Sequence, residues 1–329
     1  MTPKDRYKAV LKGEAPDHLP RIPILMQFAA EHIGSNYGAF ASDHKVLVEA
    51  NIRCASDFGI DQLSCISDPY RETSGFGAEI KFHENAVPEC LRPPLADTDD
   101  LDTLRPPDPE QAPRMRDRLD AVRWFRERDD GNHSILGWVE GPGALAANLR
   151  GLSDFYMDLL EEPEWCGELM DICTETAIRF ARAQLEAGAD SIGIGDAMCS
   201  QLSGDVYQSL IQPRQKRLVE AIHTSGGIVR LHICGQTRHL WQGIRNLGVD
   251  IFDVDHMISL KEARAALGPK IVLAGNINPV ADVRFGTPEN IRSHLRRNHA
   301  DAGDPYMICA GCEIPSGTPP ENLAALCGL

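Results

Sequence analysis

Short apolar runs rich in β-branched residues alternate along the chain with longer segments in which apolar residues recur every three or four positions. The short runs predict strands over residues 21–26, 61–67, 134–139, 191–195, 228–233, 251–254, 271–274 and 306–309. The longer segments predict helices that include residues 42–58, 163–187, 205–224, 237–247, 260–267 and 288–302. Eight strands separated by helices favour an α/β fold of the (β/α)8 barrel type, the TIM barrel, over an open doubly wound sheet.

The domain organisation that we expect is a single (β/α)8 barrel over residues 1–329, with a small hairpin insertion near residues 76–92. A chain of this length could form two domains, but α/β barrels of this size fold as one. No Gly-x-Gly-x-x-Gly sequence opens a predicted helix, so the main signature of a dinucleotide-binding fold is missing. At the N-terminus, Thr2 and Pro3 predict a capped helix that ends at Gly13.

Composition narrows the class of protein. The net charge of −15 argues against nucleic acid and against an anionic membrane surface as the main partner. No apolar run is long enough to span a bilayer, and the first residues form no signal region, so we expect a cytoplasmic protein. The 10 cysteines have irregular spacings, which indicate reduced thiols and metal ligands and not a disulfide framework.

The most informative motif is His232-Ile-Cys234-Gly, followed far downstream by Cys312 in Cys309-Ala-Gly-Cys-Glu. Because His232 and Cys234 are two residues apart on a predicted strand, their side chains share one face. A third ligand from a distant strand end would complete a zinc site with one open position, as in catalytic zinc sites. Cys309 has three readings at this point: an additional zinc ligand, one half of a redox pair with Cys312, or a buried packing thiol.

Polar residues gather where the predicted barrel strands end, which is where barrel active sites lie. They are Gln27, Asp68, Glu140, Asp196, His232, Cys234, Asp253, Asp255, His256, Asn276, Cys309 and Cys312. Among them, Glu140 is interpreted as a fourth zinc ligand or general acid, or else as a cap of the next helix. We expect Asp68 and Asp196 to bind substrate or to support a ligand histidine, with a purely structural role as the alternative.

Two further strand ends suggest contacts around the centre. Asp253 and Asp255 alternate on one face, and we expect them to support the metal ligands or to satisfy loop amides. Asn276 follows Ala-Gly and is a candidate polar contact to a cofactor or substrate, and we group Asp255 with it as cofactor-binding. Glu140, Asp68 and Asp196 form the predicted catalytic group.

Several longer motifs are similar to those of the uroporphyrinogen decarboxylase superfamily. They are Leu231-His-Ile-Cys-Gly, Leu273-Ala-Gly-Asn-Ile-Asn-Pro, Phe285-Gly-Thr-Pro-Glu, Gly311-Cys-Glu-Ile-Pro and Thr318-Pro-Pro-Glu-Asn. Within that superfamily the chain resembles the corrinoid-dependent methyltransferase branch, which includes the methylcobamide:coenzyme M methyltransferases. The resemblance implies a (β/α)8 barrel and selects Cys312 over Cys309 as the partner of His232 and Cys234.

The decarboxylase branch is the less favoured reading of the resemblance. Its members bind a substrate with many carboxylates through an arginine-bearing segment after the first strand, where this chain has Met26-Gln-Phe-Ala-Ala-Glu-His. A polyanion needs such cationic groups, and only the aspartate after the second strand has a counterpart, in Asp68. A metal-free decarboxylase-like lyase and a non-catalytic zinc-stabilised binding protein are the alternatives.

The methyltransferase resemblance implies a zinc-dependent reaction in which a methyl group moves between a corrinoid and a small molecule. Zinc would activate a thiol acceptor, or it would polarise a methoxy or methylated donor in an O-demethylase type of reaction. The chain shows no additional corrinoid-carrying domain, so we expect the cobalamin-type cofactor on a separate corrinoid protein. The sequence does not separate the two directions of transfer, or identify the donor or acceptor, the corrinoid protein or the oligomeric state.

Overall fold

The computed structural model describes residues 1–328 and contains a parallel sheet ordered β1-β4-β5-β6-β7-β8-β9. The strands are β1 (Gln62–Ser64), β4 (Ser134–Glu140), β5 (Ser191–Gly195), β6 (Ile228–His232), β7 (Ile251–Val254), β8 (Val272–Ile277) and β9 (Tyr306–Ala310). Every neighbouring pair runs parallel, so the carboxyl ends of all these strands meet at one end of the sheet. We call this end the barrel mouth.

The sheet is closed by the segment around Arg21, which bridges β9 and the start of β1. The Ile22 N–H donates to the carbonyl of Ile308 at 2.8 Å, and the Asp61 N–H donates to the carbonyl of Arg21 at 2.8 Å. The strand expected over residues 21–26 is therefore wrong, because only the isolated bridge at Arg21 forms. Pro23 has no N–H to donate, which prevents the ladder from continuing. The fold is nevertheless a (β/α)8 barrel, with this segment in the place of one strand.

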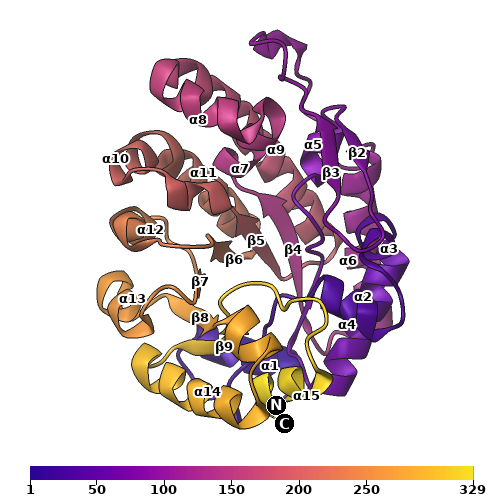
Figure 1. Cartoon of the computed structure of the whole chain (residues 1–329), viewed down its shortest axis with the longest axis vertical. Helices are drawn as coiled ribbons and strands as arrows, with labels where there is room; N and C mark the ends of the chain where they lie inside the picture. The colour runs from indigo at the N-terminus through magenta and orange to yellow at the C-terminus, as the bar shows by residue number, and fades with distance from the viewer. Residues whose placement is uncertain (329) are drawn as a thin grey trace.

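Helices form a layer around the outside of the sheet (Figure 1). They are α1 (Pro3–Leu11), α2 (Gln27–His32), α3 (Tyr37–Ser42), α4 (His44–Phe58), α5 (Arg71–Gly75), α6 (Pro113–Asp129), α7 (Pro142–Arg150), α8 (Leu152–Glu161), α9 (Pro163–Ala187), α10 (Gly204–Val206), α11 (Gln212–Thr224), α12 (Trp241–Arg245), α13 (Leu260–Leu267), α14 (Pro288–Ala302) and α15 (Pro320–Leu326). Short 3-10 or π turns cover η1 (Leu101–Thr103), η2 (Ala197–Gln201), η3 (Tyr207–Ile211), η4 (Arg238–Leu240) and η5 (Pro279–Arg284). Within residues 1–328, no helix has both the length and the apolar character needed to cross a bilayer.

Local sequence signals explain where several elements begin and end. The Thr2 hydroxyl accepts a hydrogen bond from the Asp5 N–H, and the Asp5 carboxylate accepts one from the Thr2 N–H, so a capping box starts α1. The helix expected over residues 205–224 is divided into α10, η3 and α11. Pro213 is the cause, because it lacks an N–H and its ring displaces the preceding turn. Outside the barrel, β2 (Glu79–Lys81) and β3 (Glu89–Arg92) form an antiparallel pair (Figure 1).

The interior of the barrel contains a polar network centred on Arg230 of β6. Its guanidinium donates to both carboxylate oxygens of Asp253, at 2.9 and 3.0 Å, and to Gln62 Oε1 at 2.9 Å. It also donates to the carbonyl of Ile22 at 3.1 Å, on the segment that closes the barrel. Because side chains alternate along a strand, Arg230 and His232 lie on the same face of β6. The network therefore leads from the barrel seam to the barrel mouth.

Candidate metal centre at the barrel mouth

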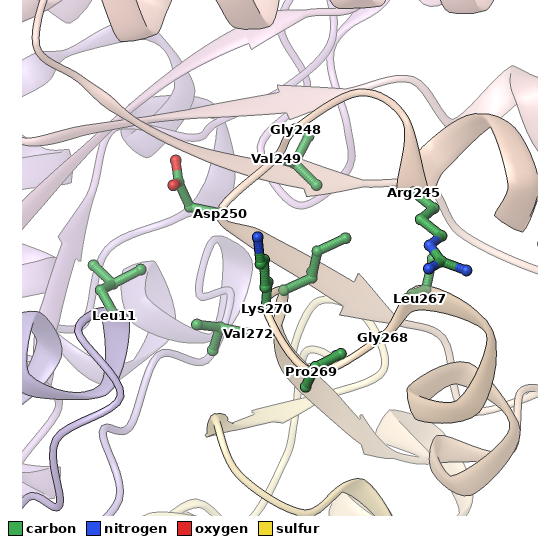
Figure 2. Close-up of a pocket in the computed structure, with 11 residues that line it drawn as sticks. Leu11, Arg245, Gly248, Val249, Asp250, Leu267, Gly268, Pro269, Lys270 and Val272 are labelled. Atoms are coloured by element: carbon green, nitrogen blue, oxygen red, sulfur yellow. The ribbon is translucent and has the colours of Figure 1, made fainter.

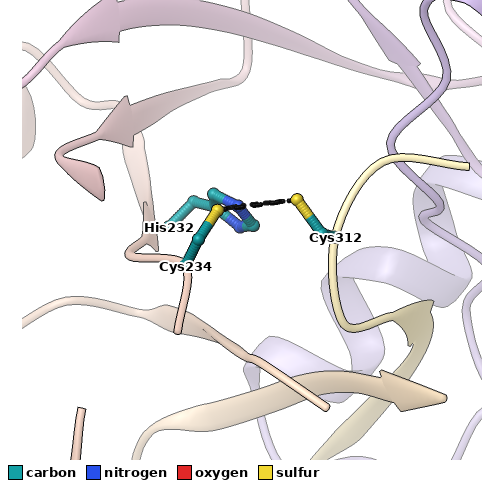
Figure 3. A group of neighbouring side chains, drawn as sticks. All are labelled: His232, Cys234 and Cys312. Atoms are coloured by element: carbon teal, nitrogen blue, oxygen red, sulfur yellow. Dashed lines mark hydrogen bonds between the residues drawn. The ribbon is translucent and has the colours of Figure 1, made fainter. Parts of the chain in front are cut away.

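Three soft or borderline donor atoms converge at the barrel mouth, from the end of β6 and the loop after β9. His232 Nε2 lies 2.9 Å from Cys234 Sγ and 3.7 Å from Cys312 Sγ, and the two sulfurs are 3.5 Å apart. Figure 3 shows His232 and Cys234 on one side and Cys312 facing them from the opposite loop. The three atoms lie within 4.8 Å of one another, which makes the group a candidate metal site.

The donor set fits zinc in chemistry and in spacing. Zinc binds cysteine sulfur and histidine nitrogen tetrahedrally at about 2.0–2.3 Å, so that neighbouring ligand atoms lie roughly 3.3–3.8 Å apart. The separations of Cys312 from Cys234 and from His232 fall in that range, at 3.5 and 3.7 Å. The 2.9 Å contact between His232 and Cys234 has to widen by about half an ångström. Three protein donors leave one tetrahedral position for another ligand.

Asp253 fixes the orientation of the His232 ring. The carboxylate lies 3.0 Å from His232 Nδ1, which leaves Nε2 directed at the two sulfurs. Burial acts to raise the pKa of Asp253, but the adjacent Arg230 charge outweighs it and lowers that pKa below its usual value. Asp253 therefore stays ionised and accepts the Nδ1 proton. This partnership of a carboxylate with a ligand histidine is the arrangement that metal sites use to fix the ring.

The two cysteines differ in their ionisation. Donation from Cys234, against the opposing effect of burial, lowers the pKa of the Cys312 thiol to about 4. The same hydrogen bond, together with burial, raises the pKa of Cys234. A thiolate is the form in which cysteine binds metal, and Cys312 is already in that form at neutral pH.

Two glycines in β5 make room for the aromatic wall beside His232. A Cβ at Gly193 would lie 2.1 Å from the Trp138 ring, and one at Gly195 would lie 3.1 Å from it. The Ser-Ile-Gly-Ile-Gly sequence of β5 therefore allows Trp138 of β4 to lie over the strand. The Trp138 and His232 rings have centroids 6.2 Å apart. This packing covers one side of the candidate centre with an apolar surface.

A cavity of about 280 Å³ opens directly onto the three donors. Its walls are formed by apolar side chains, by the three donors and by three carboxyl groups. The lining residues include Ile24, Met26, Tyr37, Ile66, Trp138, Asp68, Glu140, Glu313, His232, Cys234 and Cys312. A second cavity of about 440 Å³ shares Pro69, Glu140, Ala197 and Cys234 with it. The mouth thus has space for a small molecule next to the fourth coordination position.

A larger cavity of about 480 Å³ lies at the opposite end of the barrel (Figure 2). Its walls come from residues just before β7 and β8, including Asp250 and Lys270, and from Leu11 of α1. It contains none of the metal donors, and we do not regard it as the catalytic site. Convergent donors identify the site better than cavity size does.

Glu140, at the end of β4, is paired with a buried arginine. Arg71 donates to Glu140 Oε1 at 2.8 Å, and the Glu140 N–H donates to Glu72 Oε1 at 2.8 Å. Burial raises the pKa of Glu140 to about 8, with Arg71 opposing the rise and Glu72 adding to it. Glu140 lines both mouth cavities but does not belong to the group of three convergent donors.

Asp68 and Asp196 have different surroundings. Arg114 donates to both oxygens of Asp68, at 2.9 and 2.6 Å, and this charge outweighs burial so that the pKa of Asp68 is lowered. Asp68 also lines the cavity at the metal donors. Asp196 accepts from the Ala144 N–H at 2.7 Å and from Gln215 at 2.8 Å, and it is fully buried. The Asp196 carboxylate therefore supports the start of α7, and the Asp196 N–H donates to the His232 carbonyl at 3.1 Å. The His232 ring is oriented by Asp253 and not by either of these carboxylates.

Asp255 and Asn276 organise the loops around Cys234. Asp255 Oδ2 accepts from the Gly235 N–H at 2.9 Å, and Oδ1 accepts from the Met257 N–H at 2.9 Å. The Asn276 amide donates to the carbonyls of Asp255 and Ile258, at 3.0 and 2.6 Å. These contacts hold the loop after β6 against the loop after β7. The predicted cofactor contact of Asp255 or Asn276 would be made in addition to these hydrogen bonds.

Cys309 lies in β9, away from the converging donors. Its sulfur lies 3.5 Å from an Arg230 nitrogen inside the barrel, and burial raises its pKa to about 11. The donor group within residues 1–328 contains Cys312 and not Cys309. The position matches the packing-thiol reading of Cys309.

Sequence reasoning missed three charged residues of the mouth: Arg71, Arg114 and Glu313. Both arginines lie on helices and reach the strand-end carboxylates from α5 and α6. No spacing signal in the sequence connects them with residues up to 69 positions away. Glu313 could have been found, because it follows Cys312 directly in the Gly-Cys-Glu-Ile-Pro motif.

The uroporphyrinogen decarboxylase (URO-D) family model matches residues 2–329. A methylcobamide:CoM methyltransferase of Methanosarcina mazei is 27% identical over 329 residues, covering 98% of this chain and 95% of that protein. A uroporphyrinogen decarboxylase of Syntrophotalea carbinolica is 28% identical over 291 residues, covering 86% and 82% of the two chains. Overall identity therefore does not separate the two activities.

The solved structure of a methyltransferase from Methanosarcina mazei has the same fold. It superposes with a TM-score of 0.91 and covers 100% of this chain and 98% of that chain, at 24% identity. This similarity supports the barrel architecture over the full length. The choice between activities depends on the residues at the mouth.

Proposed function

The chain belongs to the uroporphyrinogen decarboxylase family, and from this premise we propose that it is a zinc-dependent methyltransferase acting between a corrinoid and a small molecule. The observation that carries the proposal is the convergence of His232, Cys234 and Cys312 on one point of the barrel mouth. Two thiol sulfurs and an imidazole nitrogen are donors suited to zinc. The full-length similarity to methylcobamide:CoM methyltransferases supports the same activity.

The protein residues have distinct roles in this proposal. His232, Cys234 and Cys312 hold the ion, and Asp253 keeps the Nε2 atom of His232 available for it. Bound zinc lowers the pKa of a thiol in the fourth position, or it polarises the oxygen of a methyl ether. Trp138 and the apolar cavity wall exclude water from the reacting atoms. Glu140 remains paired with Arg71 and is a candidate to donate or accept a proton beside the substrate.

The corrinoid is proposed to arrive on a separate protein that covers the barrel mouth. The methyl group would pass between the cobalt of that corrinoid and the heteroatom held next to the three donors. Two directions are consistent with this arrangement: transfer from a methylated corrinoid to a thiol, and transfer from a methyl ether or related donor to a reduced corrinoid.

The test combines both directions in one experiment on the zinc-loaded protein. Methylcob(III)alamin is mixed with small thiols, and cob(I)alamin is mixed with small methyl ethers, while the corrinoid absorbance spectrum is followed. We expect a protein-dependent change between the methylcob(III)alamin and cob(I)alamin spectra in one of the two arms. The change should disappear after removal of zinc by a chelator and return when zinc is added. No change in either arm, with zinc bound, would contradict the proposed methyl transfer.

A further inference from the structure

We propose that the mouth cavity selects small substrates whose tail, the part away from the reacting heteroatom, is positively charged or neutral, and that it rejects anionic tails. The inference rests on the proposed methyl transfer and names the class of substrate for the same site. It is carried by the charges that line the cavity and by the partners of the nearby arginines. The proposal implies that the mouth cavity disfavours a thiol with an anionic tail, such as coenzyme M.

No lysine or arginine lines either mouth cavity within the described part of the chain. The two nearest arginines are already engaged by carboxylates. Arg71 is fully buried and pairs with Glu140 at 2.8 Å, and Arg114 pairs with Asp68 through two bonds of 2.6 and 2.9 Å. A sulfonate or carboxylate in the cavity would have to displace one of these pairs. Leaving a buried carboxylate without its partner is strongly unfavourable.

The cavity wall carries a third carboxyl group without a corresponding cation. Glu313 lines the cavity beside Cys312, and its Oε1 atom accepts a hydrogen bond from the Gln27 N–H at 3.1 Å. The neighbouring charges around Glu313 are those of Cys312 and Glu31, both acidic groups. Asp68 and Glu140 each have one arginine, whereas Glu313 has no basic partner among residues 1–328. Within the part of the chain that the structure describes, the wall therefore offers carboxyl groups but no free cation to the tail of a bound molecule.

The remaining wall is apolar, so the cavity is suited to a small carbon skeleton. Ile24, Met26, Ile66 and Trp138 surround the space, and Trp138 offers an aromatic face that can contact a cation. A negatively lined cleft with apolar walls concentrates cations and disfavours anions. The reacting heteroatom would face the metal donors, with the positively charged or neutral tail toward Glu313.

Matched thiols test the inference without changing the reacting group. Cysteamine, mercaptoethanol and coenzyme M share a thiol on a two-carbon chain and differ in the charge of the tail. With methylcob(III)alamin as donor, we expect kcat/KM to fall in that order, with cysteamine about tenfold above coenzyme M. Methoxyethylamine, methoxyethanol and methoxyacetate with cob(I)alamin test the same order in the other direction. Calorimetric titration with each compound, without corrinoid, provides a binding order independent of turnover.

Glu313→Gln separates tail recognition from the intrinsic reactivity of each thiol. We expect this variant to reduce the preference for cysteamine over coenzyme M about tenfold, while its zinc content is unchanged. Glu321→Gln, on the exposed surface of α15, is the matched control and should preserve the wild-type preference. Turnover with coenzyme M as the preferred thiol would overturn the inference and leave methyl transfer intact. Tight binding of the anionic compounds without turnover in any arm would overturn both.

Discussion

The two ends of the barrel contain cavities of different size and different chemical character. The cavity at the mouth has a volume of about 280 Å³ and is lined by converging donors and buried carboxyl groups. The cavity at the opposite end has about 480 Å³, and its charged groups, such as Arg245 and Lys270, are exposed to solvent. At the mouth, by contrast, Glu140 and its partner Arg71 are both buried. We therefore place the proposed function at the end with converging donors and buried charge and not at the end with the larger cavity.

The largest expected effect is the loss of zinc on replacing a donor at the mouth. We expect about one zinc per chain in the wild-type protein and none in Cys312→Ala or His232→Ala, with methyl transfer reduced to background. Cys309→Ala is the control, because its sulfur lies against Arg230 and outside the donor group. Elemental analysis of the purified proteins measures the difference. Equal zinc in the wild type and Cys312→Ala would contradict the ligand assignment.

The next effect is on stability, at the buried charge cluster. Arg71→Met leaves Glu140 and Glu72 without their shared cation, which should lower the free energy of unfolding by about 3–5 kcal/mol. The loss should be smaller in acid, where the carboxyl groups are protonated. Urea denaturation near pH 9, where Glu140 is ionised, and near pH 5 measures both values. Arg245→Met, at the other end of the barrel, should change stability little.

Glu140 should also make stability depend on pH. Its pKa is about 8 in the folded chain and 4.5 as the reference value, so between these values the folded chain keeps a proton that the unfolded chain releases. The stabilisation from this group is fully present in acid and decreases as pH rises through that window, by about 5 kcal/mol at most. Denaturation of the wild type and Glu140→Gln across the window should show a steeper decline for the wild type. Parallel curves would contradict the raised pKa.

A smaller effect is expected at the support of the ligand histidine. Asp253→Asn retains the shape of the side chain but removes the charge that holds His232 Nδ1. Zinc affinity should fall about 10–100-fold, because such partners orient the ring and raise its basicity. Competition with a zinc-binding dye measures the change. An unaltered affinity would show that Arg230 and the barrel wall orient His232 without the carboxylate.

The smallest effect is predicted for the larger cavity itself. Lys270→Ala removes a charge that is exposed at its rim, and we expect a change in stability within about 0.5 kcal/mol and unchanged zinc content and turnover. Thermal unfolding and the corrinoid assay provide the two measurements. A large loss of turnover would remove the contrast between the two ends and indicate a functional role for the second cavity.

The sequence predicts well those elements that depend on local pattern. Residues 191–195 and 251–254 form strands as expected, because uninterrupted apolar runs are typical of buried parallel strands. The prediction fails at residues 21–26, where Pro23 interrupts the ladder of hydrogen bonds. The strand expected over residues 61–67 is shortened to Gln62–Ser64. There the Ser64 hydroxyl accepts the Ile66 N–H and turns the chain.

The residues of the candidate site likewise divide into those that local sequence patterns predict and those that depend on tertiary packing. His232 and Cys234 follow from strand alternation, and Cys312 follows from a motif, so all three are readable along the chain. Asp253 is one of several carboxylates expected to support the ligand histidine, and only its direct contact with His232 Nδ1 in the folded chain distinguishes it from Asp68 and Asp196. The pairing of Arg71 with Glu140 depends on how α5 packs beside β4, and local sequence patterns contain no information on that distance.

The position of Cys312 after the last strand has a consequence for biosynthesis. Proteins are made from the N-terminus, so a nascent chain exposes His232 and Cys234 before β9 and Cys312 have left the ribosome. β9 also forms the seam with Arg21, so the third donor comes into place when the ring of strands is completed. A truncated chain that lacks the final strand would offer only two of the three donors. Under the proposed zinc binding, stable capture of the metal would therefore distinguish a finished molecule from an unfinished one.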